Sequence, residues 1–302
     1  MTDYTSPNAV LRAISDVAKR QSKVVGGNAN TIVEMEYRNR LLARVFTASD
    51  PGWVLKGGTS TLVRLPDARA TKDIDLLREN RTLQTAIQEL KELASVNLGY
   101  FFRFTLLTTA STLEGNGQGA REGAVLTFGT YCGQTKLNNV SVDLVVSPTS
   151  LVGAVEERKS PSAQLLPRLP QGTYRLYPLV DQIADKACAM VEIRPNGQRS
   201  TRTKDLVDIV TYASTQEIES HLLRQAIVTE AHHRGLSSVD FADRVPAEEW
   251  KSRYRTAASR ISYCNRHATV FDAVDLVRDF IDGAVSNLSD PRIWSPQSLI
   301  WE

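Results

Sequence analysis

The chain has 302 residues, of which 42% are hydrophobic and 23% charged, and a formal net charge of +2. This length is sufficient for two domains of ordinary size or for one large domain. The nearly balanced charge does not by itself indicate a nucleic-acid partner. No apolar run of about 18 residues or more predicts a membrane span, and the first residues lack the pattern of a secretory signal, so we expect no membrane partner and a cytoplasmic location.

The three cysteines, Cys132, Cys188 and Cys264, are far apart in the sequence and form no CxxC pair. An odd number of widely spaced cysteines is typical of buried thiols in a reducing compartment. It does not favour a disulfide framework or a zinc site.

Two helices are predicted before the first strand. Apolar residues recur at helical spacing from residue 10 to 17, after the capping sequence Ser6-Pro7-Asn8. The glycines at 26–27 interrupt this pattern, and a second helix is predicted over 31–46. On it, Arg38 and Arg40 could reach a polyanion, but a solvated helix face is the simpler interpretation.

Residues 53–77 predict a strand, a glycine turn, a short helix and a second strand. Asp73 and Asp75 are two apart on that second strand, so their side chains project to the same face. Adjacent carboxylates repel each other, and binding a cation relieves the repulsion. Mg²⁺ prefers oxygen ligands of this kind. Gly57 and Gly58 lack Cβ atoms, so their backbone N–H groups can approach a phosphate at the start of the helix.

Residues 57–59 read GGT and residues 69–76 read RxTxDIDL. This combination resembles the nucleotidyltransferase superfamily, and more closely its AbiEii/AbiGii toxin branch, which includes the MenT toxins. The resemblance implies nucleotide binding by the glycine turn, Thr59 and Thr71, and Mg²⁺ binding and catalysis by Asp73 and Asp75. The alternative is a surface strand with two solvated aspartates that follows a glycine turn by chance.

A helix is predicted over 83–96, and strands over 101–107 and 124–132. The glycine-rich polar segment 111–123 between these strands is interpreted as a hairpin loop. It has no GxGxxG pattern, which excludes a dinucleotide-binding reading.

The next predicted strand, 139–146, places Asp143 within an apolar run. Burying a carboxylate without a partner is costly, and the site of Asp73 and Asp75 would supply one if the strands are neighbours. By resemblance, Asp143 is the third metal-binding carboxylate and a candidate general base. Alternatively, it lies in solvent or pairs with an arginine.

Four prolines in residues 160–178 predict a crossover or linker. We therefore predict an N-terminal part, 1–177, that contains the nucleotidyltransferase core, and a helical domain, 178–302. Together they form an α/β (α+β) protein with a mixed sheet.

The helical domain contains Lys186 on one predicted helix and the sequence Lys204-Asp205-Leu206-Val207-Asp208 on the next. A lysine suits the charge of a triphosphate, and Asp205 and Asp208 share a helix face. By resemblance to AbiEii-like proteins, Lys186 is a catalytic and nucleotide-binding residue, and Asp208 contributes to catalysis. Otherwise, Lys204 and Asp208 form an ordinary helical pair and Lys186 is a surface charge.

Basic residues between 194 and 204 could hold a nucleic-acid backbone or could be solvated loop charge. Two further amphipathic helices are predicted after residue 247. The apolar tail, 294–302, is expected to dock onto the protein.

These expectations combine into a magnesium-dependent nucleotidyltransferase that transfers a nucleoside monophosphate from an NTP to an acceptor hydroxyl. The resemblance implies a bacterial toxin that extends the 3′ end of tRNA and so blocks translation, with a cognate antitoxin protein as its partner. Asp143 or Asp208 would position or deprotonate the acceptor. Three alternatives remain open: modification of a protein or small molecule, a kinase of the same fold, and a catalytically silent nucleotide- or RNA-binding module.

Overall fold

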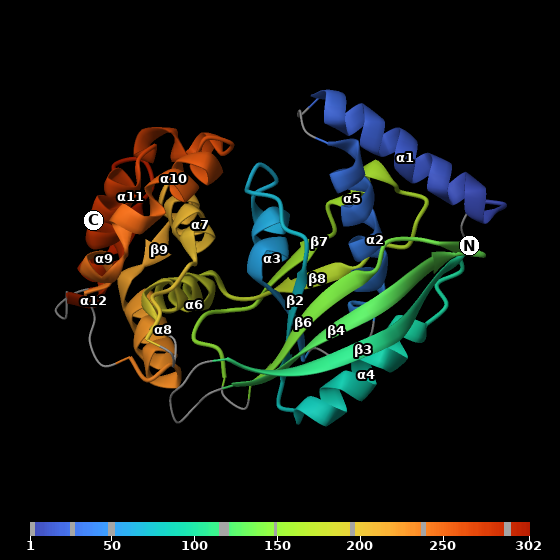
Figure 1. Cartoon of the computed structure of the whole chain (residues 1–302), viewed down its shortest axis with the longest axis horizontal. Coiled ribbons are helices and arrows are strands. Elements are labelled where there is room, and N and C mark those ends of the chain that lie inside the picture. The colour runs from blue at the N-terminus through green and yellow to red at the C-terminus, as the bar shows by residue number, and fades with distance from the viewer. Residues whose placement is uncertain are drawn as a thin grey trace.

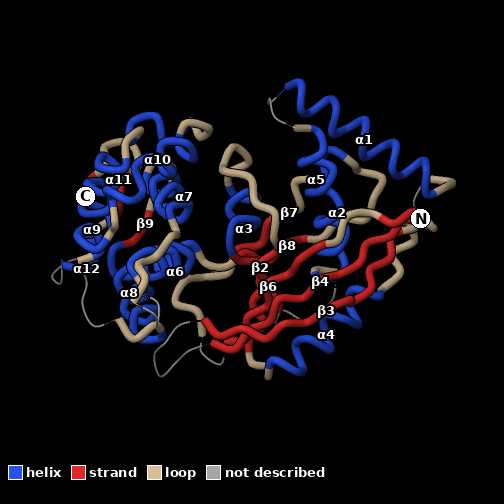
Figure 2. Tube along the Cα trace, viewed as in Figure 1, coloured by secondary structure: helices blue, strands red, loops and turns tan. Residues whose placement is uncertain are grey.

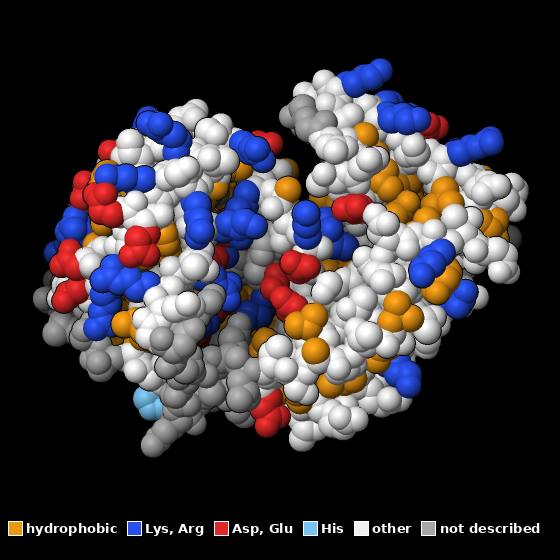
Figure 3. Space-filling model, in the orientation of Figure 1, with side chains coloured by type: hydrophobic (Ala, Val, Ile, Leu, Met, Phe, Trp, Pro, Cys, Tyr) orange, Lys and Arg blue, Asp and Glu red, His pale blue; other side chains and the backbone are white. Residues whose placement is uncertain are grey.

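A computed structural model describes residues 4–24, 28–47, 52–114, 121–147, 150–193, 197–236, 240–286 and 291–302. The N-terminal half contains a large sheet with helices packed on it, and the C-terminal half is mainly helical (Figure 1, Figure 2). The surface is hollowed between the two halves (Figure 3). The predicted α/β class with a mixed sheet is thus confirmed.

The first half follows the order that the sequence predicts, with additional short elements. Its helices are α1 (Pro7–Val24), α2 (Ala29–Val45), α3 (Gly57–Arg64), α4 (Leu83–Ser95) and α5 (Ser162–Leu165). Its strands are β1 (Trp53–Lys56), β2 (Ile74–Glu79), β3 (Phe102–Glu114), β4 (Arg121–Cys132), β5 (Thr135–Lys136), β6 (Val140–Ser147), β7 (Glu156–Lys159) and β8 (Thr173–Leu176).

The large sheet has the order β3-β4-β6-β2-β1-β8-β7, with β5 paired to β4. Strands β2 and β6 are parallel neighbours, and so are β1 and β8, whereas the other pairs are antiparallel. The pairing of β2 with β6 brings together the strands that carry the predicted acidic residues.

Alternation along the strands separates the two faces of the sheet. Ile74 and Leu76 of β2, with Val142 of β6, are buried in a core that they share with α1, α2 and α4. The intervening residues Asp75 and Asp143 therefore point to the opposite face, which is turned toward the helical half. These two carboxylates are thus placed where the two halves meet.

Two details of the sequence interpretation are wrong. The strands on either side of 111–123 do pair as an antiparallel hairpin, as predicted, but the segment is not all loop: β3 and β4 extend into it, with Ser111 opposite Ala124 and Glu114 opposite Arg121. Backbone pairing with a long partner strand explains why polar residues form strand there. Residues 160–178 are not simply a linker either, because they contain β8, which pairs with β1 inside the sheet.

The second half consists of helices and one small sheet. Its elements are α6 (Leu179–Val191), α7 (Thr203–Ala213), β9 (Ile218–Glu219), α8 (Ser220–His233), α9 (Phe241–Arg244), α10 (Ala247–Ala258), the 3₁₀ helix η1 (Ser262–His267), α11 (Val270–Val277), the π-helix η2 (Arg278–Asp282), α12 (Gly283–Ser286), β10 (Ile293–Ser295) and β11 (Ile300–Trp301). The tail docks as predicted: Trp294 is fully buried and its indole N–H donates to the Ala213 carbonyl at 2.7 Å.

Each half has its own main hydrophobic core. The first extends from Val10 to Leu176 in sequence and the second from Val180 to Trp294. The predicted boundary between 177 and 178 falls between them.

Among the described residues, no helix combines the length and apolarity that a membrane span requires. The cysteines are buried and unpaired, and burial raises the pKa of Cys132 to about 11.

The arginines of α2 are structural and not solvated, which corrects their interpretation. Arg40 is fully buried and donates to the Pro170 carbonyl at 2.8 Å. Arg38 is 6% exposed and donates to the Lys72 carbonyl at 2.9 Å. A buried guanidinium with carbonyl acceptors supports the fold. Arg38 thereby also holds the segment that leads into Asp73.

Candidate active site

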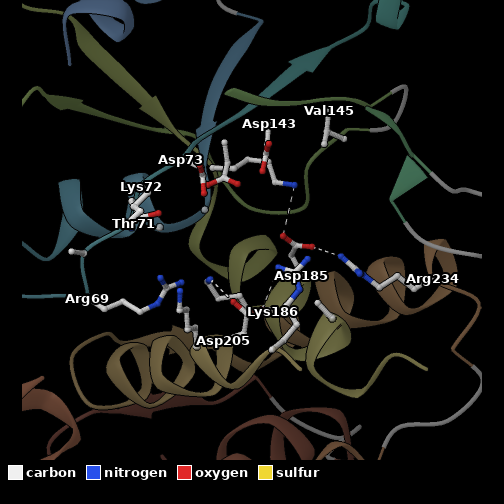
Figure 4. Close-up of a pocket in the computed structure, with 18 residues that line it drawn as sticks. Arg69, Thr71, Lys72, Asp73, Asp143, Val145, Asp185, Lys186, Asp205 and Arg234 are labelled. Carbon is white, nitrogen blue, oxygen red and sulfur yellow. Dashed lines mark hydrogen bonds and ion pairs between the residues drawn. The ribbon is translucent and has the colours of Figure 1, made fainter. Parts of the chain in front are cut away.

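A cavity of about 390 Å³ lies between the sheet and the helical half (Figure 4). The sheet half contributes Lys56, the glycine turn, residues 69–73, Asp75, Asp143 and Val145. The helical half contributes Asp185, Lys186, Ala189, Arg202, Lys204, Asp205 and Arg234. Elements far apart in the sequence thus form one polar cavity with both acidic and basic walls.

The acidic wall is built by strand pairing. Asp75 on β2 lies directly opposite Asp143 on the parallel strand β6, so both side chains project from the same face of adjacent strands. Asp73 precedes β2 and lines the same cavity. Figure 4 shows Asp73 and Asp143 on the sheet side, across from Lys186 and Asp205. The structure therefore brings together the three predicted carboxylates.

The glycine turn fits closely against Asp75. Gly57 has a φ of +60°, and a Cβ there would lie 2.0 Å from Asp75 Oδ2. Only glycine adopts this backbone conformation readily, and only a residue without a side chain leaves room for the carboxylate. The turn therefore sets the position of Asp75.

We expect Gly57→Ala to unfold at a lower temperature and to displace the Asp75 carboxylate. The left-handed conformation alone costs a residue with a Cβ about 1–2 kcal/mol, and the clash with Asp75 adds to this. Gly99→Ala is the matched control, because Gly99 also has a positive φ, +78°, but has nothing within 4 Å of its Cβ position. Gly57→Ala should lower the unfolding temperature and weaken nucleotide binding more than Gly99→Ala does. Equal effects in both variants would contradict the idea that a side chain at position 57 clashes with the Asp75 carboxylate.

The helical half also fixes the glycine turn. Gln182 of α6 donates to the Gly57 carbonyl at 2.8 Å and to the Tyr212 hydroxyl at 2.9 Å. Tyr212 in turn hydrogen-bonds to Thr61 of α3. Gln182 precedes Lys186 by four residues and so lies on the same face of α6. This helix therefore both orients the turn and supplies the predicted lysine.

Thr59 and Thr71, both predicted to bind the nucleotide, differ in their position relative to the cavity. Thr59 does not line the cavity, and its hydroxyl donates to the Asp73 carbonyl at 3.0 Å. Thr71 does line the cavity, against Gly58, where a Cβ would lie 2.8 Å from the Thr71 Cβ. Thr59 thus positions the acidic strand, and its contact with a nucleotide stays a prediction.

Lys186 is the centre of a buried ionic cluster. Its Nζ lies 2.6 Å from Asp208 Oδ2 and 3.0 Å from Asp205 Oδ1, and its side chain is 7% exposed. Burial favours the neutral amine, but the two carboxylates outweigh burial and raise the pKa of Lys186. Lys186 is therefore a positive charge at the cavity wall and not a surface lysine.

Arg69 completes this cluster, and the prediction of functional residues omitted it. Its Nε and Nη2 donate to the two oxygens of Asp208 at 2.8 and 2.7 Å. Arg202 lies 3.6 Å from Asp205 Oδ2. Three cations thus surround two carboxylates, so the cluster presents a net positive charge to the cavity. The signal in the sequence was the arginine that begins the RxTxDIDL motif.

The position of Asp208 bears on its predicted catalytic role. It is 1% exposed, does not line the cavity, and is bound by Lys186 and Arg69, not by Lys204 as an ordinary helical pair would require. Asp143, in contrast, is partly exposed in the cavity wall. A carboxylate held by two cations orients them more readily than it accepts a proton.

A second ionic group, at one end of the cavity, was not predicted. Arg234 contacts Asp185 at 2.5 Å, Glu192 at 2.7 Å and Glu230 at 2.7 Å. Asp185 also lies 3.7 Å from Lys56 Nζ. These residues join α6, α8 and β1. Arg234 lies 49 residues after its partner Asp185 and has no motif around it. The sequence alone therefore gave no indication of the ion pair between them.

The carboxylates of the cavity are suited to a hard cation whose remaining ligands would be substrate oxygens. Among the described side chains, no group of three or more His, Cys, Asp or Glu residues is arranged to hold a metal ion. Mg²⁺ is usually bound through one or two carboxylates together with phosphates and water. The in-register pair Asp75 and Asp143 meets that need, and Asp73 borders the same cavity.

The fold and this cavity define a class: an α/β core with paired carboxylates that face a glycine turn and basic residues. The chain belongs to the family described as "Nucleotidyl transferase AbiEii toxin, Type IV TA system", whose model matches residues 40–277. It is therefore a nucleotidyltransferase toxin by family, as the motifs predicted. No match is found among curated proteins.

Among solved structures, the chain is similar to MenT4, a nucleotidyltransferase toxin from Mycobacterium tuberculosis H37Rv. The TM-score is 0.53 at 15% identity, and the match covers 89% of this chain and 98% of MenT4. JHP933 from Helicobacter pylori matches with a TM-score of 0.44 at 13% identity, covering 84% of this chain and 92% of that protein. The similarity to MenT4 shows a shared fold.

Proposed function

We propose that this toxin transfers a nucleoside monophosphate from an NTP to the 3′ hydroxyl of a tRNA. The observation that carries the proposal is the pairing of Asp75 with Asp143 in one cavity wall, opposite the positive cluster around Lys186. Acidic residues that bind a cation and basic residues that bind phosphates are both required for this reaction.

The NTP would lie in the cavity with its phosphates between the glycine turn and the basic residues of the helical half. Gly57 and Gly58 present backbone at the cavity wall, where N–H groups at the start of α3 favour a phosphate. Lys186, Arg202 and Lys204 line the opposite side and would neutralise the triphosphate. Asp75 and Asp143, with Asp73 beside them in the cavity lining, would hold Mg²⁺, which when bound would stabilise the charge that develops at the α-phosphorus.

In the proposed step, the acceptor 3′ oxygen forms a bond to the α-phosphorus, and the bond from that phosphorus to the bridging oxygen of the β-phosphate breaks. Pyrophosphate leaves, and the proton of the hydroxyl passes to a carboxylate and then to water. Asp143 suits this role better than Asp208, because Asp143 faces the cavity. Asp208 would act by holding Lys186 and Arg69 in place.

Modification of the tRNA 3′ end would block aminoacylation and therefore translation. Membership of a toxin–antitoxin family supports the toxic role, and the proposal includes a cognate antitoxin protein and a cytoplasmic site of action.

The test incubates the protein with bulk tRNA, Mg²⁺ and, in parallel, α-labelled and γ-labelled NTPs. We expect α-label on tRNA and no γ-label, with loss of labelling when a chelator removes the metal. Label from the γ position alone would indicate a kinase, and label on protein a protein-modifying enzyme. RNA binding without any label would indicate a silent binding module. Any of these three results would overturn the proposal.

A further inference from the structure

A second cavity, of about 650 Å³, adjoins the first on the helical half. We name it the basic groove, and it is lined by Arg69, Thr201, Arg202, Thr203, Lys204, Asp205, Ser252, Arg253, Thr256, Ala257 and Arg260. Four of these residues, Arg69, Arg202, Lys204 and Asp205, also line the candidate active site. The groove is therefore continuous with the place where we expect nucleotide transfer.

The charge of the groove is strongly one-sided. It contains five Arg or Lys side chains and one carboxylate, Asp205, which already contacts Lys186 and Arg202. Lys204, Arg253 and Arg260 are exposed, and no ion pair to any of them is present in the described part of the chain. Figure 3 shows Lys and Arg side chains gathered on the helical half beside the hollow. These cations are available to bind an anion.

One wall of the groove is a single face of α10 and the turn after it. Arg253, Thr256, Ala257 and Arg260 recur at helical spacing, and the adjoining face of this helix is buried through Trp250 and Tyr254. The core therefore holds the helix in place. Two cations are thus set one after another along the wall, with the hydroxyls of Ser252 and Thr256 nearby.

We propose that the basic groove binds the sugar–phosphate backbone of the acceptor RNA and directs its single-stranded 3′ end into the active site. This inference rests on the proposed function and adds the surface that binds the acceptor. A polymer whose last hydroxyl reacts in the cavity must leave through an adjoining surface, and the groove shares four lining residues with the cavity. Arginine and lysine neutralise phosphates without regard to base sequence.

The chemistry of the groove favours RNA over an acidic protein. Protein docking sites are usually centred on buried aromatic or aliphatic residues. Ala257 is the single apolar side chain in the lining of the groove among the described residues. A surface of cations and hydroxyls matches a phosphodiester backbone more closely.

The experiment compares two double variants that each remove two positive charges. Arg253→Gln/Arg260→Gln changes the groove, and Arg255→Gln/Arg266→Gln changes exposed arginines that do not line it. Binding of a fluorescent single-stranded RNA 20-mer is measured by anisotropy without NTP at several salt concentrations. We expect about tenfold weaker binding for the groove variant near 0.1 M salt, and a salt slope smaller by about 1.4, because each lost phosphate contact contributes about 0.7 for a single strand.

A dinucleotide acceptor distinguishes RNA binding in the groove from the transfer reaction in the active site. It is too short to occupy both the active site and the groove, so its rate of extension should be equal in the groove variant and the wild type. The KM for a long RNA acceptor should rise in the groove variant alone. If no RNA is extended at all, the proposed function fails, while the binding measurement still reports on the groove.

Three results would overturn this inference. The first is equal RNA binding by the two double variants, and the second is no RNA binding by the wild type. The third is displacement of the RNA by polyglutamate of the same charge at equal or lower concentration, which would assign the groove to an acidic protein. Thermal unfolding of both variants checks that the fold is retained, as expected for exposed side chains.

Discussion

Asp75→Asn should reduce nucleotide transfer by at least about 10³-fold and leave the fold intact. Asparagine keeps the shape of the side chain but removes the charge that would hold a cation between β2 and β6. Charge stabilisation of the transition state by a bound metal supplies several kcal/mol, and about 4 kcal/mol corresponds to a factor of about 10³. Initial rates of α-label transfer and the unfolding temperature measure the two effects.

Asp67→Asn is the control for this variant. Asp67 is exposed in the loop between α3 and β2, the same loop that leads to the acidic strand, but it does not line the cavity. Its substitution removes the same charge and should leave transfer within about twofold of the wild-type rate. If Asp75→Asn transferred label at the wild-type rate, the placement of the active site at the β2–β6 pair would be refuted.

Lys186→Met should destabilise the protein by about 3 kcal/mol and also impair NTP binding. Methionine leaves Asp205 and Asp208 buried without their shared cation, and removing one partner of a buried ion pair costs about 3–5 kcal/mol. We expect the lower end, because Arg69 still pairs with Asp208. Denaturant unfolding at pH 7 measures the loss. The exposed neighbour Lys204→Met should change the free energy of unfolding by less than about 0.5 kcal/mol.

The contribution of Lys186 to stability should depend on pH in a defined direction. Its pKa in the folded protein is raised above the ordinary value of 10.5, so the folded state holds this proton more tightly than the unfolded chain does. The contribution is therefore fully present below about pH 10.5 and is lost as the pH rises toward the folded pKa. The difference in unfolding free energy between wild type and Lys186→Met should stay constant from about pH 7 to 10 and shrink above it. A difference that grows above pH 10.5 would contradict the paired state of Lys186.

The parts of the site that could be predicted are those in which short-range geometry determines the arrangement. Asp73 and Asp75 are close in sequence, and a glycine turn can be recognised from its residues. The strand predicted to contain Asp143 is present in the structure as β6, but its neighbour in the sheet could not be derived from the sequence. Strand order depends on which hydrophobic faces are buried together, and parallel partners such as β2 and β6 are far apart in the chain.

Residues that act through long-range ion pairs were harder to predict. Arg69 and Asp208 are 139 positions apart and yet form a bidentate pair. Arg38 and Arg40 have the sequence pattern of a solvated helix face, but both are buried: Arg40 donates to the Pro170 carbonyl in the loop before β8, and Arg38 donates to the Lys72 carbonyl in the segment before Asp73. Composition and periodicity describe one element at a time, whereas the burial of a charged side chain depends on what packs over it.

The amino-acid sequence by itself determined the family, the α/β class and the identity of the acidic strand and glycine turn, because each depends on residues within a few positions of one another. The tertiary structure alone decided that Asp143 stands beside Asp75, that Asp208 is turned away from the cavity and holds Lys186 and Arg69, and that a basic groove continues from the active site. These features arise where the two halves of the chain meet, each with its own main hydrophobic core, and the packing of one half against the other is not encoded in any single segment.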